Sequence, residues 1–299
     1  MRILQFGKTG QVGLEILVRA ASRGHTVTAL GRDTIDLGQP SRVGRAFSSA
    51  GAVDVVINGA AYTQVDKAES EPDKAFAVNG ESVGVLAEIC AKRNIPMIQL
   101  STDYVFDGTK PSPYLETDTP EPLNVYGRSK LMGETLLRAR HAQHIILRTS
   151  WVYSAHGTNF VRTMLKLGAE RDELKIVDDQ TGAPTSAADI ADTCLALCDA
   201  IAARGASTPW GTYHYAASGV TTWRHFAEAI FERARGWAGI KARIVPITTE
   251  EYGAKAKRPL NSQLNCTKLK NEFGLTGRPW QDGLNEVLAS LRPAQEAAR

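Results

Sequence analysis

Short apolar runs alternate, through the first half of the chain, with stretches whose apolar positions recur at the spacing of an amphipathic helix. The run from Val55 to Ile57 shows no alternation of polar and apolar residues, which is typical of parallel strands covered on both faces. Alternating strands and helices of this kind predict an α/β fold with a doubly wound parallel sheet. The predicted strands are Arg2–Phe6, Thr26–Leu30, Asp54–Asn58, Pro96–Leu100 and His144–Arg148, and the predicted helices include Gln11–Ser22, Ser82–Lys92 and Val125–Arg140.

The pattern becomes mixed after Trp151, and no linker rich in proline, glycine and serine marks the change. We therefore expect a first lobe at residues 1–150 and a second, smaller α/β lobe at residues 151–299 that shares an interface with it. The proline-rich stretch from Thr109 to Pro122 predicts an irregular loop. In the second half the predicted helices are Asn159–Ala169, Ala187–Ala203 and Thr222–Gly236, and the predicted strands are Lys175–Val177, Thr212–Ala216 and Arg243–Ile247.

A glycine-rich turn joins the first predicted strand to the first helix, with glycines spaced G-x-x-G-x-x-G. Such a turn lets a pyrophosphate approach the N-terminus of the helix closely. An ordinary strand-to-helix turn is the alternative, and the helical Tyr and Lys described below disfavour it. We predict a Rossmann-type dinucleotide site whose first contacts are Gly7, Gly10, Gln11, Val12 and Gly13.

The ends of the second and third strands indicate where the rest of the cofactor would lie. An acidic residue after the second strand would bind a ribose 2′-hydroxyl, but this chain has Gly31 and Arg32 there. Because an arginine can accept a 2′-phosphate, NADPH is favoured over NADH; the alternative is that Arg32 is a solvated loop residue. After the third strand, the segment from Asn58 to Thr63 has small residues that would let the backbone approach the cofactor, and Ala61, Tyr62 and Thr63 are its predicted contacts. A simple turn at the strand end is the alternative.

Tyr126 and Lys130 are spaced to lie on one face of a predicted helix. A tyrosine has a pKa near ~10, and a neighbouring ammonium group would lower it. Thr102, at the end of the fourth predicted strand, would donate a hydrogen bond to a substrate carbonyl. A proton donor, a group that tunes it and a carbonyl anchor are what carbonyl reduction requires beside a hydride source. A surface Tyr–Lys pair is the alternative.

With these motifs the chain resembles the extended short-chain dehydrogenase/reductases, and within them the family of dTDP-4-dehydrorhamnose reductases. The resemblance covers nearly the whole chain, and its motifs are specific only in combination. Beyond the glycine turn, the matching segments are Val65 to Glu69, Ser101 to Phe106, Asn124 to Gly127, Arg148 to Tyr153, Asp179 to Thr185, and Arg258-Pro259.

The resemblance implies reduction of the C4 ketone of dTDP-4-dehydro-L-rhamnose to give dTDP-L-rhamnose, with hydride from NAD(P)H and a proton from Tyr126. Lys130 would also hold the nicotinamide ribose, and Asp36 and Leu37 would contact the adenine. The second lobe would interleave with the first, so that parts of residues 181–217 return to the dinucleotide-binding lobe.

Three further residues are candidates for contact with the dTDP-sugar. Nucleotide-sugar dehydratases show Thr-Asp-Glu where this chain has Thr102, Asp103 and Tyr104, so the missing Glu disfavours dehydration. Asp103 would contact the sugar or cap its loop, and Trp151 would line the sugar pocket or lie in the core. Arg258 would meet the diphosphate or the thymine, or belong to a solvated basic stretch.

Composition narrows the class of protein. Hydrophobic residues make up 43% and charged residues 22%, which is typical of a soluble globular protein. A net charge of +3 is too small to indicate a nucleic-acid partner. The four cysteines have no disulfide-framework spacing, and Cys194 and Cys198 fit helix packing better than metal binding. With no signal-like or membrane-spanning run, we expect a cytoplasmic protein that binds no membrane.

Metal binding and dimerisation are linked in the resembled family, where some members dimerise through Mg²⁺ held by acidic residues on the first helix. Glu15 would be one such residue here, but Ala187 and Ala188 stand where an acidic partner is expected. We therefore predict no metal site, and a homodimer is left open.

Two other functions use the same fold. A non-catalytic regulatory subunit, like that of a methionine adenosyltransferase, would not need Thr102, Tyr126 and Lys130. A nucleotide-sugar epimerase would share the Tyr and Lys but retain its cofactor tightly. The sequence alone does not decide the nucleobase or the cofactor preference.

Overall fold

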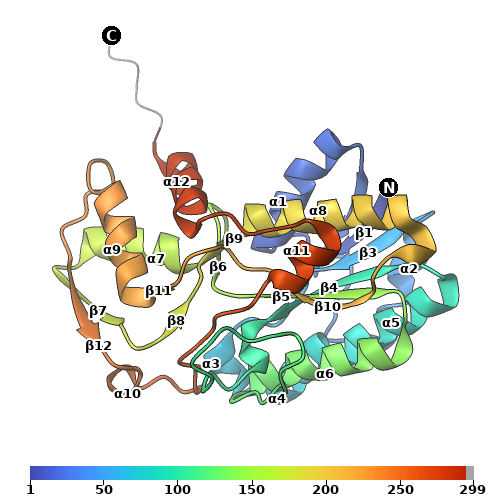
Figure 1. Cartoon of the computed structure of the whole chain (residues 1–299), viewed down its shortest axis with the longest axis horizontal. Helices are drawn as coiled ribbons and strands as arrows, with labels where there is room; N and C mark the ends of the chain where they lie inside the picture. Colours follow the sequence, from blue (N-terminus) through green and yellow to red (C-terminus); the bar gives the residue numbers. More distant parts are fainter. Residues whose placement is uncertain (294–299) are drawn as a thin grey trace, which may run out of the picture.

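The computed structural model describes residues 1–293, which form a central sheet with helices on both faces and a smaller lobe at one end (Figure 1). The sheet has six parallel strands in the order β10-β5-β4-β3-β1-β2. This order confirms the doubly wound fold. The strands are β1 (Arg2–Phe6), β2 (Thr26–Leu30), β3 (Val55–Asn58), β4 (Met97–Thr102), β5 (His144–Thr149) and β10 (Gly211–His214).

Successive residues of the central strands point to opposite faces of the sheet, and both faces are buried. Val55 and Ile57 pack against α1 and α8, whereas Val56 packs on the opposite face toward α5 and α6. The apolar runs in the sequence have this physical cause, because neither face of these strands meets water. The helices are α1 (Gln11–Ala20), α5 (Ser82–Arg93), α6 (Val125–Arg140) and α8 (Ala187–Arg204).

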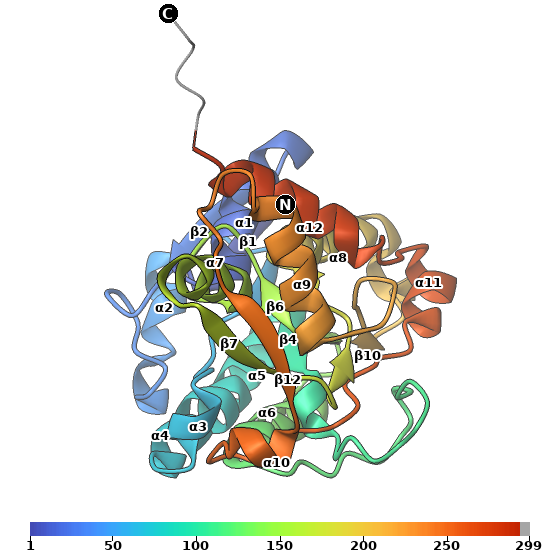
Figure 2. The same ribbon diagram turned by 90° about the vertical axis from the view of Figure 1, so that its left-hand side faces the viewer.

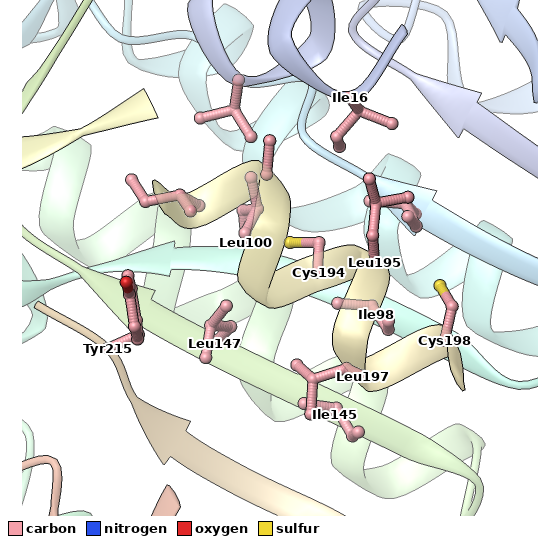
Figure 3. Close-up of a cluster of buried hydrophobic side chains, with 14 of the residues drawn as sticks. Ile16, Ile98, Leu100, Ile145, Leu147, Cys194, Leu195, Leu197, Cys198 and Tyr215 are labelled. Atoms are coloured by element: carbon pink, nitrogen blue, oxygen red, sulfur yellow. The ribbon is translucent and has the colours of Figure 1, made fainter. Parts of the chain in front are cut away.

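Helix α8 comes from the second half of the chain but covers the first-half strands. Cys194 and Cys198 lie in its buried face, against Ile98 and Ile145 of the sheet (Figure 3). All four cysteines are free, and the packing role expected for this pair is confirmed. Strand β10 likewise returns to the sheet and pairs with β5.

The smaller lobe is built around β7 (Glu173–Val177) and β12 (Arg243–Ile247), which pair in parallel (Figure 2). Its separate core includes Phe226, Ile230 and Leu284. Helices α7 (Phe160–Glu170), α9 (Trp223–Ala234) and α12 (Trp280–Leu291) supply most of that core. Short strands link the lobes: β6 (Val152–Tyr153) pairs with β9 (Thr185–Ser186), and β8 (Thr181–Gly182) with β11 (Thr221–Thr222).

The long helices and strands agree with the sequence prediction. The differences are the exact ends of some elements and several short helical segments that were not predicted. The first helix ends at Ala20 rather than Ser22, because a 3₁₀ turn and the left-handed Gly24 (φ 71°) follow it. The proline-rich segment before α6 forms the irregular loop that was expected. The unpredicted helical pieces are η1 (Ala21–Arg23), η2 (Pro40–Arg42), α2 (Arg45–Ser49), α3 (Val65–Ala68), α4 (Pro72–Phe76), the π turn η3 (Ala77–Glu81), η4 (Asp103–Val105), η5 (Gly205–Ser207), α10 (Thr249–Tyr252) and α11 (Thr267–Phe273).

Candidate active site

A cavity of about 460 Å³ opens at the carboxyl ends of the sheet strands. Ligands of open α/β sheets bind at this edge, because the loops after the strands meet there. Of the predicted residues, Gly7, Gly10, Gln11, Val12, Arg32, Asp36, Leu37, Ala61, Thr63, Tyr126 and Lys130 line it. Gly59 and Ala60, from the small-residue segment after the third strand, line it as well. Sequence reasoning missed several other lining residues, namely Phe6, Thr9, Leu30, Gly31, Ile35, Val78, Leu100, Ser101, Thr149, Val152, Gly157 and Thr158.

The glycine turn packs backbone against backbone. Gly7 has φ 96°, and a Cβ there would lie 2.7 Å from the Ala60 nitrogen. A Cβ on Gly13 would lie 2.0 Å from the Gly7 carbonyl oxygen, and the Gly13 carbonyl accepts a hydrogen bond from the Gln5 side chain (3.1 Å). Gly13 therefore shapes the turn from behind and does not line the cavity.

Arg32 and Asp36, the two charged candidates after the second strand, differ in how their side chains are held. Arg32 is exposed, and its side chain is at the rim of the cavity. The Asp36 carboxylate accepts hydrogen bonds from the Gly38 nitrogen (2.8 Å) and the Gln39 side chain (3.4 Å), which closes its loop.

Tyr62 is buried outside the cavity lining. Its hydroxyl donates to Glu71 (2.9 Å), and its backbone nitrogen donates to Asn79 (2.8 Å). These bonds hold the loop after β3, in which Ala61 and Thr63 line the cavity.

Tyr126 and Lys130 lie in the first turns of α6 and line the same cavity as the glycine turn. The Asn124 side chain caps this helix by accepting a hydrogen bond from the Gly127 nitrogen (2.8 Å). The Lys130 ammonium donates to the Leu100 carbonyl oxygen at 2.7 Å.

The net shift of the Tyr126 pKa in this structure is upward, and burial rather than Lys130 is its largest cause, which corrects the expectation from the spacing. Burial raises the pKa of Tyr126 to about 12, while a hydrogen bond with the Thr102 side chain opposes that rise. The nearby charge of Asp103 acts in the same direction as burial. The physical reason is that desolvation of the phenol dominates, and the Lys130 ammonium is directed at Leu100.

Thr102 links Tyr126 to Asp103, although neither Thr102 nor Asp103 lines the cavity itself. The Thr102 hydroxyl donates to Asp103 Oδ1 (3.0 Å) and accepts from the Tyr104 nitrogen (3.2 Å). Burial raises the pKa of Asp103 to about 6, and hydrogen bonds with Ser262 and Thr102 oppose it. Asp103 is therefore the group of this small network whose pKa lies nearest to neutral pH.

Trp151 lies against the smaller lobe rather than in the cavity lining. Its ring stacks on Trp223 of α9 at a centroid distance of 3.6 Å, over Gly182. Its φ of 48° is in the left-handed region, a strained conformation for a bulky residue. Trp223 gave no sequence signal beyond its place in an amphipathic helix.

Arg258 also lies outside the cavity lining and joins the end of the chain to the first lobe. Its guanidinium pairs with Asp66 of α3 at 2.7 Å, and it forms a hydrogen bond with Tyr104, beside Tyr126. In the sequence the Val65 to Glu69 segment is only a motif of the resembled family, so the ion pair between Asp66 and Arg258 was not predicted.

Glu15 pairs with Arg19 at 3.3 Å and lies 3.6 Å from His156. Within residues 1–293, no group of three or more His, Cys, Asp or Glu side chains could hold a metal ion. No helix in this part of the chain is both long and apolar enough to cross a membrane.

Comparisons with known proteins agree over nearly the whole chain. A family model described as the RmlD substrate binding domain matches residues 1–292. The dTDP-4-dehydrorhamnose reductase of Burkholderia thailandensis is 47% identical, over 94% of this chain and 96% of its own length. That of Escherichia coli K12 is 44% identical, over 97% and 98%.

Solved structures give the same result. The dTDP-4-dehydrorhamnose reductase of Clostridium acetobutylicum superposes with a TM-score of 0.89 and 36% identity, over 97% of this chain and 99% of its own. The Bacillus anthracis enzyme, solved in complex with NADP, gives a TM-score of 0.88 and 33% identity over the same shares.

Proposed function

Because this chain belongs to the RmlD family of dTDP-4-dehydrorhamnose reductases, we propose that its cavity binds NADPH and that Tyr126 protonates the reduced sugar. The reaction is the reduction of dTDP-4-dehydro-L-rhamnose to dTDP-L-rhamnose. The observation that carries this proposal is that Tyr126, Lys130 and the glycine turn line one cavity, with Thr102 hydrogen-bonded to Tyr126.

The residues present fit a dinucleotide. Gly7 and Gly10 line the cavity beside the N-terminus of the ten-residue α1, and the first turn of α1 has no acidic residue to repel a pyrophosphate. Gly10, Gln11 and Val12 lie at that end, so their backbone N–H groups would hold the pyrophosphate. Asp36, Leu37, Ala61 and Thr63 would contact the adenosine half.

Arg32 supports NADPH as the preferred form. It is an exposed cation that lines the cavity, so its side chain would turn toward a 2′-phosphate. A guanidinium group binds a phosphate through paired, charge-assisted hydrogen bonds. NADH, which has no 2′-phosphate, would bind without this contact.

When bound, the nicotinamide supplies a hydride to the C4 carbon of the ketosugar. Thr102 would turn its one hydroxyl proton from Asp103 to the ketone oxygen, and Tyr126 would pass its proton to that oxygen as negative charge develops on it. The raised pKa of Tyr126, about 12, keeps the phenol protonated at neutral pH, as a proton donor must be. Lys130 would bind the nicotinamide ribose and stabilise the phenolate that remains.

The sugar and nucleotide would lie between this edge and the smaller lobe. Asp103 would accept hydrogen bonds from sugar hydroxyls, and the Trp151 ring would pack on the hexose. Arg258 is close enough to Tyr104 for a hydrogen bond, which supports a role at the dTDP diphosphate. Residues 1–150, with α8 and β10, would then form the dinucleotide-binding lobe, and the rest of 151–299 the substrate lobe.

One incubation tests the reaction. The protein is mixed with dTDP-4-dehydro-L-rhamnose and either NADPH or NADH, and the sugar is identified by NMR. We expect one NADPH oxidised for each dTDP-L-rhamnose formed, with NADH used less well. A regulatory subunit would oxidise neither cofactor, and an epimerase would change the sugar without net oxidation; either result would overturn the proposal. We further place the protein in the cytoplasm, which fractionation of cells would test.

A further inference from the structure

A buried carboxylate, Glu134, lies one helical turn beyond Lys130 on α6, with a side chain only 1% exposed. Its two oxygens are fully engaged. Arg148 donates to it twice, at 2.9 Å and 2.6 Å, and the Ser101 hydroxyl donates at 2.6 Å. Arg138 adds a fourth contact at 3.1 Å from the more exposed side.

These contacts tie the catalytic helix to the two strands that carry the site. Ser101, at the end of β4, lines the cavity and precedes Thr102. Arg148 precedes Thr149, a lining residue at the end of β5. A single carboxylate on α6 therefore fixes the ends of β4 and β5 relative to the helix that carries Tyr126.

The charges around Glu134 come from three elements. Arg138 and Lys130 share α6 with it, Arg148 comes from β5, and His214 of β10 lies behind Arg148. His214 is neutral, because burial and the charge of Arg148 lower its pKa to about 3. Its Nδ1 lies 3.1 Å from the Tyr114 carbonyl oxygen and donates to it, so Nε2 accepts from Arg148.

A second acidic group, Asp103, lies outside this cluster. It accepts a hydrogen bond from Thr102, and its charge raises the pKa of Tyr126. Glu134 itself stays ionised: burial would raise its pKa, but the hydrogen bonds and charge of Arg148 outweigh burial and lower it.

Lys130 needs a negative charge nearby. Its side chain is buried, its ammonium donates to a carbonyl oxygen at 2.7 Å, and none of the ion pairs found within residues 1–293 includes it. Burial lowers the pKa of Lys130 to about 8, and the charge of Glu134 opposes that fall. Without Glu134, an appreciable share of Lys130 would be neutral at the pH of the cell.

We infer that Glu134 is a positioning residue for the reduction, which keeps Lys130 cationic and holds Lys130 and Thr102 in fixed relation across α6, β4 and β5. The inference rests on the role proposed above for Lys130. A purely structural ion pair, by contrast, would affect stability and leave the charge state of Lys130 unchanged.

The test compares Glu134→Gln, which removes the charge and keeps the shape, with Glu134→Asp, which keeps the charge. In the protein without cofactor, the Lys130 pKa is measured by NMR titration of lysine labelled with ¹³C at Cε, the signal being assigned by its loss in Lys130→Met. In the complete enzyme, kcat and KM for NADPH are measured from pH 6 to 10. Glu88→Gln is the control, because Glu88 pairs with Arg140 of the same helix on the exposed side.

We expect the Lys130 pKa in Glu134→Gln to fall by about one unit or more, the size of effect that a nearby opposite charge produces. The alkaline limb of kcat/KM should move down by the same amount. Glu134→Asp should keep both values near those of the unaltered protein, and Glu88→Gln should change neither.

An unchanged Lys130 pKa in folded Glu134→Gln overturns the inference, whatever the activity does. A shifted pKa with an unmoved alkaline limb supports the coupling but overturns the proposed role of Lys130. Because Glu134→Gln leaves Arg148 buried without its partner, it can fail to fold. The double variant Glu134→Gln/Arg148→Met then replaces it and is compared with Arg148→Met, in which Glu134 keeps Arg138 and Ser101 as partners. The Lys130 pKa in the double variant must lie below that in Arg148→Met for the inference to survive.

Discussion

Two cations line the cavity, and their different burial indicates different tasks. Lys130 is buried and only 5% exposed, so its charge is sensitive to its neighbours and suits a group that acts on the reacting atoms. Arg32 is exposed at the opposite end, where it can adapt to a mobile phosphate without paying a desolvation penalty. We expect substitutions of Lys130 to change the rate of the chemical step, and substitutions of Arg32 to change only the preference between NADPH and NADH.

Arg32→Ala tests whether Arg32 sets the preference for NADPH. If Arg32 neutralises a 2′-phosphate, the substitution should raise the KM for NADPH roughly ten- to a hundredfold, since a hydrogen bond to a charged group contributes about 1.5–3 kcal/mol. The KM for NADH should hardly change. Arg42→Ala, another exposed arginine outside the cavity lining, is the control. Equal effects of Arg32→Ala on both cofactors would exclude this role.

The sequence predicted residue types better than residue environments. Spacing alone brought Tyr126 and Lys130 to one helix face, and both line the cavity. Spacing could not predict that burial would raise the tyrosine pKa, because desolvation depends on the whole fold. Trp223 and Asp66 were missed for a similar reason, since each acts through a partner, Trp151 or Arg258, that is distant in the sequence.

At the scale of elements, α6 is seated by two glycines that touch the backbone of other segments. A Cβ on Gly127 would lie 2.1 Å from the Tyr104 carbonyl oxygen, and one on Gly133 would lie 2.1 Å from the Asn79 carbonyl oxygen. No side chain can be inserted at either point unless the helix moves. The position of Tyr126 therefore depends on a glycine beside it as much as on its own packing.

Gly127→Ala should displace the N-terminus of α6. Overpacking of this kind typically destabilises a protein by about 1–3 kcal/mol, and contact with a rigid backbone leads us to expect the upper end. Urea denaturation would measure the loss. Gly236→Ala is the matched control, because a Cβ there meets nothing within 4 Å. Similar unfolding free energies for the two variants would show that α6 is not seated in this way.

Length decided which elements the sequence could predict. Helix α6 has a long periodic pattern and was predicted with its observed bounds, Val125–Arg140. The two-residue strands β6, β8, β9 and β11 have no pattern to detect, because pairing across the lobes defines them. Helix α10 is different, because a local capping box between Thr248 and Glu251 begins it, a signal that the sequence analysis did not use.

At the scale of the whole molecule, the chain crosses between its lobes more than once. Strand β10 completes the sheet beside β5, and α8 covers its face with residues such as Ile190, Leu195 and Ile201. Composition gave no sign of this return, which only the resemblance implied, because strand partners are not encoded in a local pattern. The first half of the chain thus depends on the second for its core.

A fragment of residues 1–150 should consequently fail to fold alone. It would expose the apolar face that α8 covers and leave β5 as an unprotected edge. Circular dichroism on heating should show no cooperative transition for the fragment and a cooperative one for the whole chain. A fragment extended to residue 217 is the control, and it should regain structure. Cooperative unfolding of the 1–150 fragment would contradict this dependence.

The central claim is that the cavity face of α6 carries the chemistry, and kcat of Tyr126→Phe tests it most directly. The substitution removes only a hydroxyl group, so folding and NADPH binding should persist. We predict that kcat falls on the order of 10²–10⁴-fold, the loss expected for a general acid. Adding Lys130→Ala should reduce kcat by much less than it does alone, since the phenolate that Lys130 would stabilise no longer forms. A folded Tyr126→Phe protein that binds NADPH and retains most of its turnover would contradict the account.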